Sequence, residues 1–275
     1  MIDLPTFTAT RYLQPLREGG SLPAVVDTDG GGLFVTKFRG AGQGAKALVA
    51  ELIAGLIARE LALPTPELAL IEVPPPFGRG EPDPEIQDLL RASHGLNVGA
   101  RYLDGAFNFD PAAAGECVSP ELAADVVWFD ALLTNPDRTH RNPNLLIWRR
   151  EPWLIDHGAT LYAHHDWSAV DEARARTPFP LIAQHVLLAR AGDIERADAR
   201  LAPRLGEAVL REVLARVPDA LLAHAGGATS PAAARERYIE YLGTRLRAPR
   251  AFVAEAAAAR DRVRREPPRP LSARR

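Results

Sequence analysis

The sequence predicts an α+β fold of two lobes: a small, antiparallel β-rich N-lobe with one main helix, then a larger, mostly α-helical C-lobe. Short β-type runs and glycine-rich turns fill the first hundred residues, whereas helical spacing dominates from residue 177 onward. We therefore expect the N-lobe over 1–103 and the C-lobe over 104–260. The Arg- and Pro-rich end, 261–275, is expected to be disordered.

The N-lobe is expected to hold strands on both sides of its helix. Gly19-Gly20-Ser21 and Asp29-Gly30-Gly31-Gly32 are typical of turns, because glycine readily adopts positive φ angles. The main helix is expected over 46–61, since Pro64 stops it. The expected strands lie at 12–16, 23–27, 33–38, 68–73 and 96–103.

The C-lobe is expected to combine helices with one small hairpin. Ser119-Pro120-Glu121 is a typical helix start, because serine caps the helix, proline suits its first position and an acid follows. This helix should reach Thr134, and a polar loop over 135–143 follows it. Further expected elements are strands at 144–148 and 153–155 and helices at 205–216 and 232–246.

Composition excludes several classes of function. The net charge of -2 and the pI of about 6.4 give no bulk attraction to nucleic acid. Cys117 is the only cysteine, so neither an intramolecular disulfide nor a cysteine metal cluster is expected. The N-terminus does not resemble a signal peptide, and no run of 18 apolar residues predicts a membrane span. We therefore expect a cytoplasmic protein.

Lys37 and Glu51 form the first candidate pair. Glu51 is the only charged residue between Ala47 and Ala58, and a helix that is apolar all round is buried. A buried carboxylate needs a partner, and Lys37 on the preceding strand is the nearest candidate. A strand lysine held by a helix glutamate is the arrangement that binds nucleotide phosphates. In the alternative, Glu51 faces solvent and Lys37 is an ordinary strand-end lysine.

The polar loop NPDRTHRN, at 135–142, carries the second candidate group. Asp137 and Asn142 have the spacing of a kinase catalytic loop, in which the carboxylate accepts the proton of the attacking hydroxyl and the amide oxygen reaches Mg2+. Arg138 and Arg141 flank this site, where they either neutralise the transferred phosphate or make structural contacts. Turn chemistry alone also explains Asp and Asn in a polar loop.

Asp156 ends the second strand of the hairpin, in the sequence LIDHG. A carboxylate at a strand end suits Mg2+, which prefers hard oxygen ligands, and the hairpin folds the chain back so that Asn142 and Asp156 meet at one metal. Asp-x-Gly is also a common turn. The order of all five residues, on elements of the right type, predicts an ATP- and Mg2+-dependent phosphotransferase.

These motifs resemble those of the HipA-like kinases, a bacterial branch of the protein-kinase-like superfamily. The resemblance covers residues 10–165 and rests on NPDRTHRN, on LIDHG, and on FVTKF with the helix AELIAGLIARELALPTPE. Phosphatidylinositol kinases share related loops. The resemblance implies a bilobal protein-kinase-like fold and transfer of the ATP γ-phosphate to a hydroxyl, that of Ser or Thr on a protein.

The resemblance also implies a role for each residue. The phosphates of ATP bind Lys37, Glu51 positions that lysine, and Asp137 is the catalytic base. Asn142 and Asp156 hold Mg2+.

Adenine is expected to hydrogen-bond the backbone of 100–103, at Ala100 and Tyr102. The loop that covers the phosphates is either Gly19-Gly20-Ser21 or Gly40–Gly44 with Lys46.

Alternatives remain for the activity and the acceptor. A nucleotide-binding pseudokinase or regulatory module would bind ATP without transfer, and a small-molecule kinase would phosphorylate a lipid or an aminoglycoside. The chain lacks convincing counterparts of the extra N-terminal subdomain and the regulatory serine loop of HipA toxins. Toxin activity, an antitoxin partner and a tRNA-synthetase substrate are therefore not expected to carry over. Asp130, in an apolar helix segment, is expected to anchor the catalytic loop by a hydrogen bond.

Overall fold

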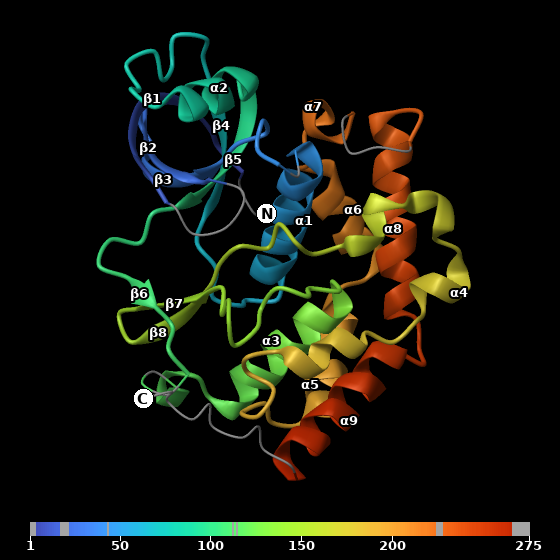
Figure 1. Cartoon of the computed structure of the whole chain (residues 1–275). Helices are drawn as coiled ribbons and strands as arrows, with labels where there is room; N and C mark the ends of the chain where they lie inside the picture. The colour runs from blue at the N-terminus through green and yellow to red at the C-terminus, as the bar shows by residue number, and fades with distance from the viewer. Residues whose placement is uncertain are drawn as a thin grey trace.

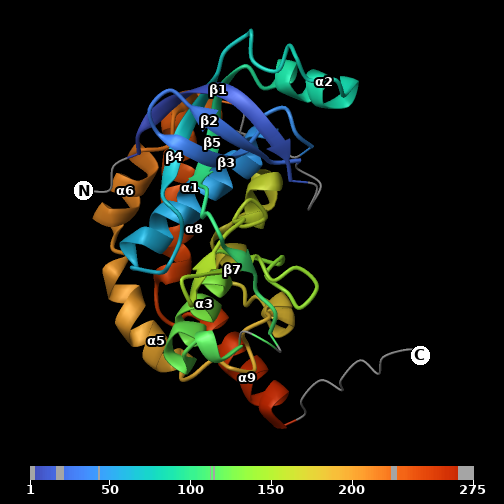
Figure 2. The same cartoon turned by 90° about the vertical axis from the view of Figure 1, so that its left-hand side faces the viewer.

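The computed structural model of the chain describes residues 4–16, 22–42, 44–111, 113, 115–223 and 228–265. Within these residues, a β-barrel built from the first part of the chain sits against a larger helical part, and a small sheet lies beside the barrel (Figures 1 and 2). The Gly19-Gly20-Ser21 turn, predicted from the sequence, lies outside the described residues.

Five strands close the barrel in the order β1-β2-β3-β5-β4. Four of its five pairings are antiparallel, but Thr6–Thr8 of β1 pairs in parallel with Leu70–Glu72 of β4, which corrects the wholly antiparallel sheet predicted from the sequence. Register shifts bend β1, so one half pairs with β4 and the other with β2. The strands are β1 (Thr6–Pro15), β2 (Ala24–Thr28), β3 (Gly32–Lys37), β4 (Leu68–Val73) and β5 (Gly95–Arg101).

The main helix, α1 (Gly44–Glu60), lies between the barrel and the helical part (Figure 1). Its residues from Leu48 to Ala58 are all buried, as its apolar sequence predicts. A Cβ at Gly55 would come within 2.6 Å of Leu68 Cδ1, so glycine allows α1 to pack closely on β4. On its other side α1 contacts α6 (Glu207–Ala215) and α7 (Asp219–Leu222).

The helical part is organised around α3 (Pro120–Leu132), whose N-terminus is capped by Ser119 as expected from the sequence. The helix is buried along most of its length because α5 (Ile194–Leu201), α8 (Pro231–Leu246) and α9 (Ala251–Arg265) pack against it. The shorter elements of this part are α4 (Glu172–Ala175) and the 3-10 turns η1 (Gly115–Cys117), η2 (Tyr162–His165), η3 (Trp167–Ala169), η4 (Pro180–Gln184) and η5 (Ala202–Arg204).

The last helix extends further than predicted. The sequence predicted a disordered tail from residue 261, whereas α9 continues to Arg265. Two guanidinium groups hold this end of the helix, because Arg260 donates to the carbonyl of Gly192 at 2.5 Å and Arg264 to that of Ala191 at 2.7 Å. These contacts join residues about 70 positions apart in the chain, so local sequence does not reveal them.

Three strands form the small sheet, where the sequence predicted a two-stranded hairpin. The strands β7 (Leu145–Trp148) and β8 (Glu151–Leu154) make that hairpin, and the very short β6 (Phe107–Asn108) pairs with β7. A two-residue strand has no periodicity to detect in a sequence. The remaining helix, α2 (Pro84–Ala92), packs at the barrel end.

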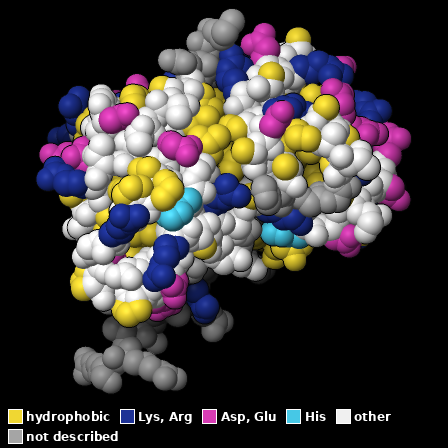
Figure 3. Space-filling model, turned by 90° about the horizontal axis from the view of Figure 1, so that it is seen from above, with side chains coloured by type: hydrophobic (Ala, Val, Ile, Leu, Met, Phe, Trp, Pro, Cys, Tyr) yellow, Lys and Arg dark blue, Asp and Glu magenta, His cyan; other side chains and the backbone are white. Residues whose placement is uncertain are grey.

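Among the described residues, no helix combines the length and hydropathy needed to cross a bilayer. On the face shown in Figure 3, basic and acidic side chains are interspersed, in keeping with the small net charge.

Candidate active site

Lys37, Glu51 and Asp156 meet where β3, α1 and the end of β8 come together. The Nζ of Lys37 lies 2.6 Å from Oε2 of Glu51 and 2.5 Å from Oδ1 of Asp156. The same Glu51 oxygen accepts the backbone N–H of His157 at 2.8 Å. The structure therefore confirms the contact between Lys37 and Glu51 that the sequence predicted.

Burial and neighbouring charges shift the pKa values of Lys37 and Asp156 in opposite directions. Burial by itself would lower the pKa of Lys37, but the two carboxylates at Glu51 and Asp156 more than offset it and raise the pKa above its ordinary value. Burial by itself would raise the pKa of Asp156, but the Lys37 ammonium keeps it below the ordinary value. Both partners are consequently charged at neutral pH.

A local turn delivers Asp156 to the lysine. Asp156 has a φ of 55°, in the left-handed region, which asparagine and aspartate tolerate better than most residues. The strand before it is fixed by two backbone bonds, from Leu154 to the carbonyl of Pro64 and from Ile155 to that of Asn144. Gly158 follows, and a Cβ there would lie 3.5 Å from Lys37 Nζ.

Asp137 is held by three asparagines. Its Oδ2 accepts the side-chain amides of Asn142 at 2.9 Å and Asn144 at 3.0 Å, and its backbone N–H donates to Oδ1 of Asn135 at 3.0 Å. Asn142 thus turns its amide nitrogen toward Asp137, which leaves its carbonyl oxygen for another partner. Sequence reasoning missed Asn144 and Asn135 as positioning residues. Both lie beside the Asp137–Asn142 pattern, and that position was the available signal.

A buried ionic network supports the loop from below. Both oxygens of Asp130 are used: Oδ1 accepts Asn135 at 2.8 Å, and Oδ2 accepts Arg138 Nε at 2.6 Å and His185 Nε2 at 2.9 Å. Burial by itself would raise the pKa of Asp130, but Arg138 and His185 hold it well below the ordinary value. Asp130 therefore anchors the catalytic loop, as the sequence predicted.

The histidines of this network are neutral. Arg138 can only donate, so Nδ1 of His157 is the acceptor at 3.2 Å and the ring proton is on Nε2. Nδ1 of His185 accepts the Leu187 backbone N–H, so its Nε2 carries the proton that bonds Asp130. Burial lowers the pKa of His157 to about 4 and also lowers that of His185. Sequence reasoning missed His185, since only the fold brings it to Asp130.

Arg138 does not occupy the place that the sequence suggested. The side chain is fully buried, and besides Asp130 and His157 it donates to the carbonyls of Asn144 and Ile155. A guanidinium so engaged behind the loop is a positioning group, so its proposed contact with a transferred phosphate is wrong. Arg141, by contrast, lines the neighbouring cavity.

This cavity, of about 610 Å³, opens in front of Lys37. Its walls come from the barrel strands, from the segment after β5 and from the small sheet. Asp137 is not among the lining residues but is bonded to two of them, Asn142 and Asn144. The predicted site residues that line it are Lys37, Glu51, Ala100, Tyr102, Asn142 and Asp156.

The two candidate phosphate-covering loops differ in position. Gly40 and Gly42 line another cavity, of about 410 Å³, together with residues of α2. A Cβ at Gly40 would come within 2.7 Å of the Cβ of Ala92, so this loop packs on α2 and does not line the cavity of Lys37. Leu16 and Pro23 do line the cavity of Lys37. The predicted Gly19-Gly20-Ser21 loop lies between them in the sequence, outside the described residues.

The residues present fit a magnesium ion. Asn142 offers its carbonyl oxygen and Asp156 its second carboxylate oxygen, both hard ligands at the same cavity. The described residues contain no cluster of three or more His, Cys, Asp or Glu side chains that would cage a metal. Magnesium is commonly held in this way, by one or two protein oxygens with phosphates and water supplying the rest.

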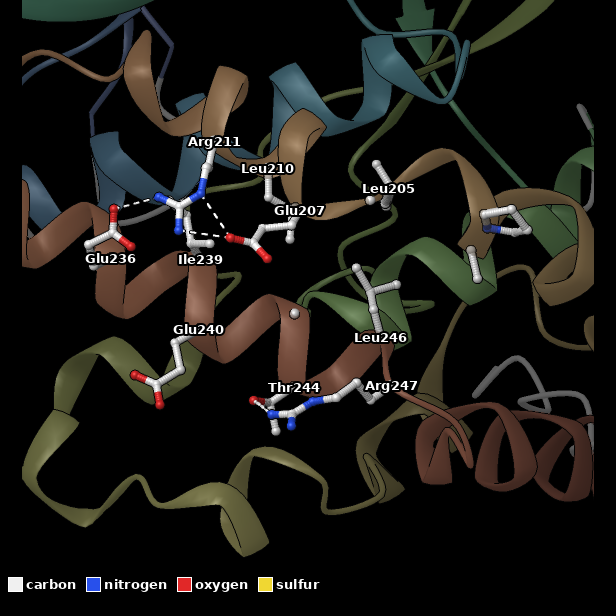
Figure 4. Close-up of a pocket in the computed structure, with 14 residues that line it drawn as sticks. Leu205, Glu207, Leu210, Arg211, Glu236, Ile239, Glu240, Thr244, Leu246 and Arg247 are labelled. Atoms are coloured by element: carbon white, nitrogen blue, oxygen red, sulfur yellow. Dashed lines mark hydrogen bonds and ion pairs between the residues drawn. The ribbon is translucent and has the colours of Figure 1, made fainter.

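A larger cavity, of about 720 Å³, runs between α6 and α8 (Figure 4). Its central cation, Arg211, is already bound by Glu207 at 2.9 Å and by Glu236 at 2.7 Å. Because none of the predicted site residues lines this cavity and its Arg211 is neutralised within the chain, we assign it no role in the chemistry.

The fold and the site together define a member of a kinase family. The model of the HipA-like kinases matches residues 10–174, more than half of the chain, so the chain belongs to that family. Among solved structures the chain is similar to the Helicobacter pylori proinflammatory kinase CtkA, with a TM-score of 0.56 and 14% identity. The similarity covers 94% of this chain and 99% of that one, and at this identity it establishes the fold. No curated protein matched the chain in sequence.

Proposed function

We propose that the chain is an active kinase that transfers the γ-phosphate of ATP, with Mg2+, to a hydroxyl group. The observation that carries the proposal is Lys37 held between Glu51 and Asp156 at the edge of a 610 Å³ cavity. These three side chains place a cation that can bind phosphates, Lys37, beside a carboxylate that can bind a metal, Asp156. In this proposal the barrel with α1 belongs to an N-lobe over 1–103 and the helical part to a C-lobe over 104–260.

Each residue has a task in the transfer. Lys37 binds the α- and β-phosphates, while Glu51 fixes its ammonium. Asn142 and Asp156 hold the metal, which neutralises charge on the phosphates. Asp137 orients the acceptor hydroxyl and takes its proton. The acceptor oxygen then bonds to the γ-phosphorus as the bond from phosphorus to the β–γ bridging oxygen breaks, and ADP leaves.

The nucleotide base has a defined place in this proposal. The backbone amides of Arg101 and Tyr102 already donate to the carbonyls of Glu67 and Leu33. The Tyr102 amide is thus unavailable to adenine, and we assign the contact to the amide of Leu103 and the neighbouring carbonyls. Val35 from β3 and Leu146 from β7 both line the cavity and supply apolar surface for the ring. A cytoplasmic setting supplies the ATP and Mg2+ that this reaction needs.

The test is turnover of γ-labelled ATP with Mg2+, comparing the wild type with Asp137→Ala and Asp156→Ala. Both variants are expected to lose at least 100-fold in rate, since each removes a group that acts on the transferred phosphate. Asp88→Ala is the matched control, because Asp88 is exposed on α2 and its ion pair, with Arg91, is an exposed one within the same helix. Equal turnover in all four proteins would refute the assignment.

The same experiment separates a kinase from a nucleotide-binding module. A module without transfer would show thermal stabilisation by Mg2+-ATP but no labelled product in the wild type. An active kinase shows both, and Asp137→Ala keeps the stabilisation while it loses the product, since Asp137 does not line the nucleotide cavity.

A further inference from the structure

A fourth cavity begins one residue before Asp137. It measures about 330 Å³ and includes Thr134 and Pro136 in its lining, at the start of the catalytic loop. The opposite walls come from the segment after Asp156, at Tyr162 and Val170, and from 174–181. The start of the catalytic loop, at residues 134 and 136, therefore lines this cavity. Residues 141, 142 and 144, at the end of the loop, line the cavity of Lys37 instead.

Arg245 fixes the walls of this cavity to the catalytic loop. The buried guanidinium donates to the carbonyls of Ala131 and Leu132 at 2.9 and 2.8 Å, and to those of Ala175 and Thr177 at 2.8 and 3.2 Å. The first two carbonyls belong to the last turn of α3, where they have no partner within the helix and where the helix dipole favours a cation. One side chain thus ties the 175–177 wall to the helix from which the loop of Asp137 emerges.

The mouth of the cavity is unusually apolar for a surface. Four large hydrophobic side chains among the described residues are exposed, and two of them, Tyr162 at 66% and Leu181 at 49%, line this cavity. Phe179 is buried beneath them. Exposed apolar side chains gathered around a cavity mark a place where a partner is bound.

The charged side chains that line this cavity are basic. The charged lining side chains are Arg174 and Arg245, and no acidic residue belongs to the lining. Arg174 is exposed, and the described residues give its guanidinium no ion pair. Asp166 interacts with Arg174 electrostatically, while its Oδ1 accepts the hydroxyl of Ser168 at 2.6 Å. Arg174 therefore retains donors for an acidic group of a partner.

We propose that this cavity selects the acceptor, which is a polypeptide. A large apolar side chain next to the phosphorylated Ser or Thr enters between Tyr162 and Leu181, and an acidic residue of the same peptide pairs with Arg174. The inference rests on the proposed function, and the transfer itself is the step given there. Neighbouring residues of an extended peptide lie about 3.3 Å apart, so one peptide reaches both Asp137 and a cavity that starts at Pro136.

The test uses a peptide library with one central Ser or Thr and each flanking position varied, with labelled ATP and Mg2+ and the full chain. We expect about tenfold selection for Leu, Met or Phe at one fixed position, the factor that burial of one apolar side chain gives. Leu181→Asp is expected to abolish this selection while ATP binding stays unchanged. Leu13→Asp is the matched control, since Leu13 is exposed to 44% and lines neither cavity.

A charge swap makes the second arm. Arg174→Glu is expected to replace a preference for Asp or Glu in the peptide by a preference for Lys or Arg. Transfer to peptides without these preferences, or with preferences that Leu181→Asp leaves intact, refutes the cavity but not the kinase. Transfer to kanamycin and other aminoglycosides but to no peptide refutes the polypeptide acceptor. Absence of any ATP turnover refutes the proposed function itself, and this inference with it.

Discussion

The Nζ of Lys37 lies 2.5 Å from the carboxylate of Asp156, although 119 residues separate them in the chain. The contact joins the last residue of a barrel strand to the turn that follows the small sheet. Glu51 completes it from α1, and its oxygen also receives the His157 N–H. Three separate elements are thereby connected through one largely buried cation, so Lys37 has a structural role in addition to the phosphate-binding role that we propose for it.

Replacement of Lys37 is therefore expected to affect stability and turnover together. Lys37→Met leaves Glu51 buried and unpaired, which should cost about 3–5 kcal/mol in the free energy of unfolding. ATP turnover should fall at least 100-fold. Urea denaturation and labelled-ATP assays measure the two effects. Lys46→Met is the matched control, since Lys46 is the only other lysine and its Nζ makes one long contact, 3.5 Å, with the carbonyl of His165.

Asp130 offers a test of the positioning network that spares the cavity itself. Asp130→Ala leaves the fully buried Arg138 without its carboxylate, and we expect a loss of about 3–5 kcal/mol in the free energy of unfolding. Denaturant midpoints measure this loss, and Asp88→Ala should change them by less than about 0.5 kcal/mol. A small effect in both variants would contradict the anchoring role.

Metal dependence should identify the ligands. Asn142→Ala removes an oxygen ligand, so the Mg2+ concentration for half-maximal turnover is expected to rise about tenfold or more. Asn142→Asp restores an oxygen and should recover part of the affinity. Turnover titrated with Mg2+ at fixed ATP provides the measurement. Asn108→Ala is the control, since Asn108 lines the same cavity from β6. An unchanged Mg2+ requirement in Asn142→Ala would remove it from the metal site.

Stability is expected to fall in mild acid because of His157. Its folded pKa of about 4 lies below the ordinary 6.5, so between these values the unfolded chain binds more protons than the folded one. The free energy of unfolding should therefore decrease as the pH falls from about 7 to 4, by roughly 3 kcal/mol from His157 alone. Urea denaturation across this range measures the slope.

The comparison of variants isolates the His157 contribution. His157→Gln should remove the His157 share of the pH dependence of the unfolding free energy, because the glutamine side chain does not titrate. His164 and His185, whose pKa values burial also lowers, keep their own shares in this variant. Identical pH profiles for wild type and His157→Gln would contradict the argument.

Several elements could be predicted from local sequence alone. The strand at 68–73 has the bounds that the sequence predicted, because prolines lie just before and just after it. Glu51 was found because a lone charge in an apolar helix must have a partner. The strand β6 and the parallel pairing of β1 with β4 were not predicted, since both depend on which strands meet in space.

The sequence by itself determined which groups could do chemistry: a rare lysine, a lone helix glutamate, and Asp and Asn residues at motif spacing. Such patterns lie within short stretches of sequence, so they can be recognised without coordinates. Only the tertiary structure decided that Arg138 points into the buried network and away from the phosphate site, and that His185 and Asn144 hold the loop. The direction of a side chain and the partners it meets depend on long-range packing, which no spacing along the chain encodes.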